Sequence, residues 1–80
     1  MKAEKYNIFI EAGGQVSVKV RHGFGAAGEE VQKILDTGTV ERIRVKIDGT
    51  NTEALFIPTP GKPYRLLDIK QKIKSLTFEF

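Results

Sequence analysis

Two segments near the start of the chain alternate apolar and polar residues with a period of two. Residues 5–11 place Tyr6, Ile8 and Ile10 on one side, and residues 16–20 place a valine at every second position. This alternation predicts two β-strands, each with one buried side and one solvent-facing side. The Gly-Gly pair between the segments favours a tight turn, so the strands are predicted to form an antiparallel hairpin.

The next segment begins with a glycine-rich break at residues 23–28 and continues into a helical pattern. Apolar residues spaced i, i+3 and i+4 predict a short helix over residues 29–37. Two glutamates at its start favour the helix dipole, and Gly38 has the position of a C-terminal cap. The same stretch also allows a hairpin with its turn at residues 36–38, and this alternative stays open.

Residues 39–48 show the cleanest alternation in the chain, with β-branched aliphatic residues on one face and three basic residues on the other. This pattern predicts a half-buried strand. A turn at residues 48–51 and a returning strand at 54–57 complete a second hairpin, because Pro58 and Pro60 end the returning strand.

The last third of the chain fits two structures. Apolar residues follow helical spacing over residues 66–76, where Asp68 is placed as in a capping box. The alternative is a pair of strands at residues 64–69 and 73–80. In either case the alternation at residues 75–80 predicts a C-terminal strand whose apolar side must be covered.

These elements predict a single small domain over residues 1–80 with an α+β, β-rich fold. We expect an antiparallel sheet of two hairpins plus a C-terminal strand, with one or two short helices to one side. An all-β sandwich is the alternative. The sequence has no window of membrane-spanning length and no opening stretch like a signal peptide, so a cytoplasmic or virion-associated location is expected.

The composition narrows the chemistry. The 80 residues are 40% apolar and 29% charged, as in a soluble globular domain. Cysteine is absent and His22 is the only histidine, so we expect neither a zinc site nor a catalytic triad. We therefore predict a protein that is not an enzyme and that needs no metal or cofactor.

Residues 23–28 match the glycine pattern GxGxxG. The pattern follows a predicted strand, precedes a predicted helix and has Asp48 about twenty residues further on, so it resembles the dinucleotide-binding fingerprint. The resemblance implies that Gly23, Gly25 and Gly28 admit a pyrophosphate and that Asp48 binds a ribose hydroxyl. A flexible glycine-rich connection is the competing interpretation, because the half-polar strand before it does not suit a parallel sheet buried on both faces.

The net charge of +3 permits an anionic partner. Basic residues are predicted on the solvent side of two strands, and an aromatic residue lies in the glycine-rich segment, so together they could track a phosphate backbone and stack on a base. These candidate nucleic-acid-binding residues are Lys19, Arg21, Arg42, Arg44, Lys46 and Phe24. The competing interpretation is that the charges keep half-exposed strands in solution.

Phe78 and Phe80 share one face of the predicted last strand, which either completes the core or docks on a partner. Residues 8–18 resemble the opening hairpin of small β-rich modules in phage tail and baseplate proteins, and this resemblance implies a virion-type structural or accessory role. We therefore expect a non-catalytic module that presents a sheet face or edge to a protein partner or to a second copy of itself. Nucleic-acid binding is the alternative, and nucleotide binding at residues 23–28 is a minor one.

Overall fold

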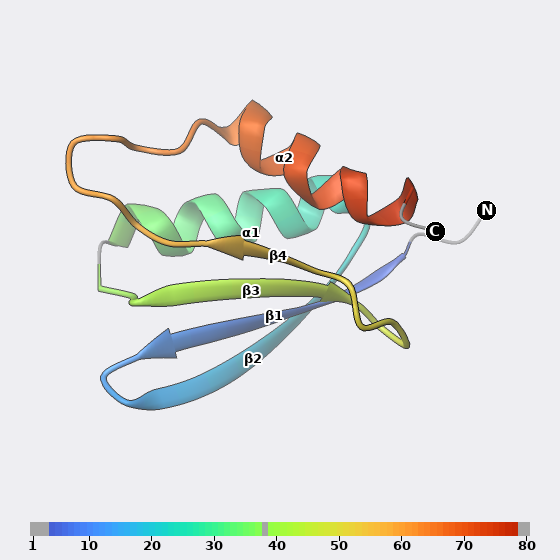
Figure 1. Cartoon of the computed structure of the whole chain (residues 1–80), viewed down its shortest axis with the longest axis horizontal. Helices are drawn as coiled ribbons and strands as arrows, with labels where there is room; N and C mark the ends of the chain where they lie inside the picture. Colours follow the sequence, from blue (N-terminus) through green and yellow to red (C-terminus); the bar gives the residue numbers. More distant parts are fainter. Residues whose placement is uncertain (1–3, 38, 79–80) are drawn as a thin grey trace.

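The computed structural model describes residues 4–37 and 39–78, which form a four-stranded antiparallel sheet with two helices on one of its faces (Figure 1). In chain order the elements are β1 (Lys5–Ala12), β2 (Gln15–His22), α1 (Phe24–Thr37), β3 (Arg42–Ile47), β4 (Glu53–Phe56), α2 (Leu66–Lys74) and a 3-10 helix, η1 (Ser75–Phe78). The predicted α+β, β-rich fold is confirmed. The all-β alternative is wrong, because both ambiguous segments are helical.

The chain repeats a ββα unit. The strands are arranged in the order β2-β1-β3-β4, so the first strand of each unit lies in the centre of the sheet and the second strand lies at an edge. The two units join where β1 pairs with β3, with Ile8 opposite Val45. Helices α1 and α2 then pack side by side over the same face of the sheet (Figure 1).

The core lies between that face and the helices. The strands β1, β3 and β4 contribute alternate residues to it, and α1 and α2 contribute one stripe each. The buried apolar residues are Tyr6, Ile8, Ile10, Ile43, Val45, Ile47, Ala54 and Phe56 from the sheet and Ala27, Val31, Ile34, Ile69, Ile73 and Leu76 from the helical segments. Strand β2 contributes none of them.

The turn of the first hairpin explains why β2 contributes no residue to the core. Gly13 and Gly14 both have positive φ, 60° and 79°, as a two-residue turn of type I′ requires. Ala12 therefore pairs with Gln15, and the register that follows places Val18 opposite Phe9. Phe9 lies on the face of β1 that points away from the helices, so the valines of β2 do too. The hairpin is confirmed, but the prediction that these valines occupy the buried side is wrong.

The glycine-rich segment is not a loop. Helix α1 begins at Phe24, directly after Gly23, whose φ of 89° turns the chain out of β2. The amide of Ala27 donates to the carbonyl of Gly23 at 3.0 Å, which forms the first helical turn. The predicted helix is therefore confirmed but starts five residues earlier than residue 29. As a result its two glutamates lie beyond the first turn, and the predicted cap at Gly38 lies outside the described residues.

The second hairpin is confirmed. Gly49 has a φ of 84°, and the amide of Thr50 donates to the carbonyl of Ile47 at 3.0 Å, which closes the turn. Strand β4 is short, and Pro58 follows it. The connection that follows β4 packs on the sheet through Tyr64. The ring of Tyr64 contacts the ring of Phe56 edge-on, with their centroids 5.6 Å apart.

The C-terminal segment is helical. Helix α2 is confirmed, but the capping box is not formed: Arg65 is the N-cap residue without a side-chain cap, and Asp68 accepts a hydrogen bond from its guanidinium at 3.2 Å. The predicted C-terminal strand is wrong at residues 75–78, which form η1. Leu76 is buried there because it continues the apolar stripe of α2 onto the core. Phe80 lies outside the described residues.

Two glycines of α1 have opposite roles that mutation can separate. An added Cβ at Gly28 would lie 2.6 Å from Cγ of Lys70 on α2, whereas Gly25 has open space around it. We expect Gly28→Val to lower the free energy of unfolding by about 2–3 kcal/mol through overpacking. Gly25→Ala should raise it by up to about 1 kcal/mol through helix propensity. Urea denaturation checks both, and equal effects would contradict this packing.

Candidate functional site

The face of the sheet that points away from the helices carries the candidate site, and we call it the open face. Its residues come from all four strands. They are Val16, Val18 and Val20 of β2, Asn7, Phe9 and Glu11 of β1, Arg42, Arg44 and Lys46 of β3, and Glu53 and Leu55 of β4. The pairing aligns them in rows across the sheet, and the central row runs Val18, Phe9, Arg44, Leu55.

The apolar part of the open face lies over β2. Val16, Val18 and Val20 are 57%, 52% and 38% exposed. Their neighbour Phe9 is half-buried, and Leu55 is exposed at the other edge of the face. Side by side on one strand, the three valines form an apolar row that faces solvent.

Two glutamates offset most of the positive charge on the basic part of the open face. Glu11 accepts two hydrogen bonds from Arg42, at 2.7 and 3.1 Å, and one from Arg44 at 3.0 Å. Glu53 lies 3.6 Å from the Arg44 guanidinium. The hydrogen bond from Arg42, with the charges of both arginines, holds the pKa of Glu11 below its ordinary value despite some desolvation. Hence Arg42 and Arg44 are held in fixed positions by acidic neighbours.

Phe9 and Lys46 complete this part of the face. The guanidinium carbon of Arg44 lies 5.0 Å from the centroid of the Phe9 ring, within cation–π range. Lys46 makes no ion pair with any residue of the segments 4–37 and 39–78. Of the three basic residues of β3, Lys46 is therefore the one whose charge is not offset by a carboxylate in contact with it.

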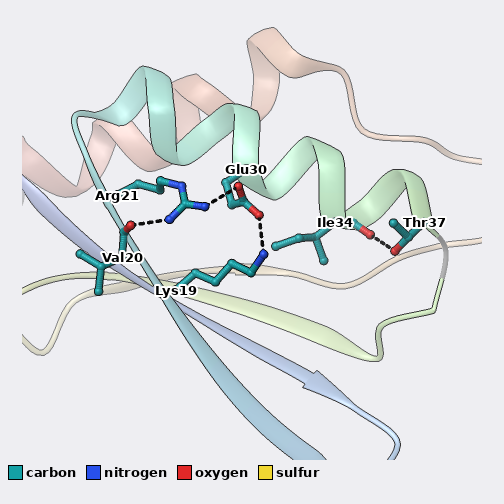
Figure 2. Close-up of polar contacts among 6 residues, drawn as sticks. All are labelled: Lys19, Val20, Arg21, Glu30, Ile34 and Thr37. Carbon is teal, nitrogen blue, oxygen red and sulfur yellow. Dashed lines mark hydrogen bonds and ion pairs between the residues drawn. The ribbon is translucent and has the colours of Figure 1, made fainter.

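Lys19 and Arg21 lie on the opposite side of the sheet. In β2 they alternate with the valines, so they point toward α1, where both reach Glu30 (Figure 2). Lys19 Nζ lies 3.2 Å from one carboxylate oxygen and Arg21 Nη2 lies 2.9 Å from the other. The five basic residues proposed as one nucleic-acid-binding surface are thus divided by the sheet, with three on the open face and two on the helix side.

Glu30 is a structural residue that the sequence analysis treated only as a helix-start glutamate. Its side chain is 9% exposed. Burial by itself raises the pKa of this carboxyl, but hydrogen bonds and charge from Lys19 and Arg21 outweigh burial, so the pKa of Glu30 is lowered. The helical stripe gives a signal for this role, because Glu30 is three residues after Ala27 and four before Ile34, on the side that faces the sheet.

The aromatic candidates do not join the open face. Phe24 lies at the start of α1 in the helical layer, where the ammonium of Lys74 is 5.4 Å from its ring centroid. Phe78 belongs to η1 and not to a strand edge. The aromatic residue that does lie among basic residues of the sheet is Phe9, which was not among the candidates predicted from the sequence.

The dinucleotide-binding geometry is absent from this fold. Gly25 and Gly28 are helical, so they do not form a phosphate-binding loop, and the strands before and after α1 belong to an antiparallel sheet. Asp48 lies in the β3–β4 turn, where its carboxylate accepts a hydrogen bond from Asn7 at 3.1 Å and lies 4.0 Å from Lys5 Nζ. The strand, loop and helix context that the fingerprint needs is therefore not met.

Small-molecule pockets, metal sites and membrane-spanning helices are the other features considered for the described residues. A shallow pocket of about 120 Å³ lies between α1 and the 58–64 connection, and it is smaller than the roughly 300–1,000 Å³ typical of ligand pockets. No group of three or more candidate metal ligands occurs among residues 4–37 and 39–78. Within the same residues, neither α1 nor α2 has the length and apolarity that crossing a membrane takes.

Comparison of the chain with protein-family models, with curated proteins and with solved structures finds no significant match. Functional inference therefore depends on the geometry of the open face and of the strand edges.

Removing the carboxylate of Glu30 tests its role. In Glu30→Gln, Lys19 and Arg21 lose their shared countercharge, but both remain partly exposed to water. We therefore expect the free energy of unfolding at neutral pH to fall by about 1–2 kcal/mol. Glu29→Gln is the matched control: Glu29 is 69% exposed and lies 3.6 Å from Lys70, so its effect should stay within about 0.5 kcal/mol. Thermal or urea denaturation measures both.

The same variant alters the acid dependence of stability. Because the pKa of Glu30 is lower in the folded chain than its ordinary value of 4.5, its contribution is complete above that value and is lost as the pH falls through the folded pKa. The difference in unfolding free energy between wild type and Glu30→Gln should shrink on acidification below about pH 4.5. A difference that stays constant down to pH 2 would show that Glu30 does not act as a paired carboxylate.

Proposed function

We propose that this protein is a non-catalytic binding module that uses the open face of its sheet to bind a macromolecular partner, most simply another protein. One observation carries the proposal: the apolar residues of β2 point away from the protein's own core. A role as a structural or accessory subunit of a larger assembly is the form of this function that best fits so small a domain.

The orientation of β2 supports the proposal, because exposing its valines forgoes stability that their burial would give. A strand that alternates valine with polar residues gains stability when the valines are buried. Here Ser17, Lys19 and Arg21 take the side toward the helix, and the valines stay in water. The part of the row that stays exposed gains no transfer free energy in the free chain, but burial against a partner would recover it.

The chemistry of the open face defines the partner it would suit. The valine row and Phe9 call for an apolar surface. The β3 residues Arg42, Arg44 and Lys46 exceed Glu11 and Glu53 by one positive charge, so acidic groups on the partner should lie over β3. Because the arginines are already fixed by their glutamates, little side-chain entropy is lost on binding.

Nucleic-acid binding is the second candidate. The observation that favours it is the alignment of Arg42, Arg44 and Lys46 on one open strand next to Phe9, because a flat sheet with cations and an aromatic ring suits a single strand. The ion pairs of Arg42 and Arg44 with Glu11 weaken this candidate, since a phosphate must compete with a carboxylate already in place.

A triple substitution tests the binding module. Val16→Thr, Val18→Thr and Val20→Thr together keep the β-branched shape and replace one methyl group of each valine with a hydroxyl, which makes the row more polar. We expect each change to alter the free energy of unfolding by no more than about 0.5 kcal/mol, because the side chains are exposed. Affinity for a partner should fall at least about tenfold. The partner is first captured from the source cells, then purified and titrated into the ¹⁵N-labelled protein at low concentration.

The control for this experiment is Leu67→Gln, which removes an exposed apolar side chain of α2 on the other layer of the molecule. Leu67→Gln should leave the affinity for the partner unchanged. When the partner is titrated into the ¹⁵N-labelled wild type, the amide shifts should be confined to residues of the open face. Shifts centred on the helices, or equal losses in the two variants, would rule out the open face as the binding surface.

Salt separates the second candidate from the first. If the open face binds single-stranded DNA or RNA, retardation of an oligonucleotide should weaken steeply between roughly 50 and 200 mM salt. In that case Lys46→Gln should weaken binding more than Lys19→Gln, because Lys19 lies on the helix side with Glu30. The absence of retardation at the lower salt concentration would exclude this candidate.

A further inference from the structure

The two edges of the sheet differ in how their backbone groups are satisfied. An unpaired strand edge presents a row of N–H and C=O groups that another strand can bind, and proteins usually block such edges. Strand β4 forms one edge and β2 forms the other. Figure 1 shows β2 at the border of the sheet farthest from α2. The two edges differ in how many backbone groups remain free to bind another strand.

The β4 edge is partly blocked. The strand has four residues, and Lys72 of α2 donates from Nζ to the carbonyl of Leu55 at 2.6 Å. Just beyond the strand, the hydroxyl of Tyr64 accepts from the amide of Ile57 at 3.3 Å and lies 3.2 Å from its carbonyl. Pro58 then ends the strand, because it has no amide hydrogen with which to continue the pairing to β3. The carbonyl of Leu55 and both backbone groups of Ile57 are therefore already occupied, so this short edge offers a second strand fewer backbone groups than the β2 edge does.

The β2 edge is open. Residues with odd numbers in β2 face β1, as the hydrogen bond from Gly23 N to Glu4 O at 2.8 Å confirms at the end of the ladder. The amides and carbonyls of Val16, Val18 and Val20 therefore point outward. The carbonyl of Val20 accepts from Arg21 Nη1 at 2.6 Å (Figure 2). For the remaining outward groups, no hydrogen bond is found within residues 4–37 and 39–78.

We propose that β2 pairs antiparallel with β2 of a second copy of this chain, joining two four-stranded sheets into one continuous sheet of eight strands. This goes beyond the partner-binding role of the open face, because it uses the edge of β2 and leaves the face free. Strand β2 has eight residues, contains no proline, and is exposed along nearly its whole length.

Side-chain pairing selects one register, with Val18 opposite Val18 of the second copy on the twofold axis. In this register Val16 lies opposite Val20 of the other copy, so all six valines form cross-strand pairs on the open side. A shift by one residue toward the strand end places Lys19 opposite Lys19. A shift the other way leaves Val20 of each copy opposite Gly14 of the other and reduces the cross-strand valine pairs from three to two. The valine-centred register is therefore preferred.

Charge complementarity agrees with that register. Lys19 lies opposite Ser17 of the second copy, and Arg21 lies opposite Gln15, so no two cations are directly opposed. Lys19 of the two copies are diagonal neighbours, at roughly 7–8 Å between the strands. In each copy Glu30 is within 3.2 Å of Lys19 and 2.9 Å of Arg21, so this carboxylate offsets the repulsion at the junction.

Cysteine trapping tests the register directly, because the chain has no cysteine. Two copies of residue 18 would have their Cα atoms about 5.5 Å apart, within disulfide range. We expect Val18→Cys to form a disulfide-linked dimer under mild oxidation. In Val16→Cys and Val20→Cys the two copies of the cysteine lie roughly 13 Å apart, so these variants should stay unlinked. Equal linking of all three would overturn the register and the proposal.

A backbone substitution separates the edge from the face. Val18→Pro removes an outward amide that β1 does not use, a change tolerated on an edge strand. Light scattering from roughly 10 µM to 1 mM should give a mass that rises toward two chains for wild type and stays at one for Val18→Pro, a loss of at least about tenfold in affinity. Val18→Thr, which keeps the amide, should dimerise within about threefold of wild type.

Amide exchange gives a readout that does not depend on variants. The amides of Val16, Val18 and Val20 should exchange more slowly as protein concentration rises, whereas those of Ser17 and Lys19, which bond to β1, should not change. A wild-type mass of one chain at roughly 1 mM would overturn the proposal. So would a dimer that survives Val18→Pro but is lost in the triple threonine variant, because that result assigns self-association to the open face.

Discussion

The register of the first hairpin is the constraint on which the rest of this molecule depends. Because strand side chains alternate between two faces, a turn of two residues fixes which row of β2 lies beside which row of β1. Gly13 and Gly14 impose that turn. The valines then lie beside Phe9 rather than beside Ile8, and the core is completed without them. An exposed apolar row and a basic inner row on β2 both follow from this single choice.

The inner row of β2 in turn explains the position of an acidic residue in α1. Lys19 and Arg21 face a helix whose neighbouring side chains are apolar, and two cations there would be unfavourable without a countercharge. Glu30 supplies one carboxylate oxygen to each. On the other side of the sheet Glu11 is the shared countercharge of Arg42, which bonds to both carboxylate oxygens, and of Arg44, which bonds to one of them. Four of the thirteen basic residues of the chain are therefore held in two clusters around buried or half-buried glutamates.

Much of the fold follows from the sequence, because the period of two in four segments and the glycines of the turns are local signals. The start of α1 was missed because Gly25 and Gly28 have low helix propensity, and packing of Gly28 against Lys70 overrides it. The last segment was misassigned because Leu76 fits a strand and a helix equally well. The face of the valines was in principle readable: a two-residue turn at Gly13 and Gly14 already places Val18 opposite Phe9. The helical stripe places Glu30 on the side of α1 that faces the sheet, but its ion-pair partners, like those of Glu11, lie on other segments and have no local signal.

The repeated ββα order also bears on how the chain assembles. Each hairpin closes between neighbouring residues, whereas β1 and β3 must find one another across roughly 30–40 residues, which carries a larger loop-closure entropy. Local hairpins should therefore form before the central ladder, as contact-order arguments hold. The valine row of β2 is then accessible from the earliest stage of folding, before either helix packs on the sheet. Newly synthesised chains at high local concentration all expose this valine row. The turn at Gly13 and Gly14 fixes the side of β2 on which the valines lie, and it therefore limits the registers in which two such strands can pair.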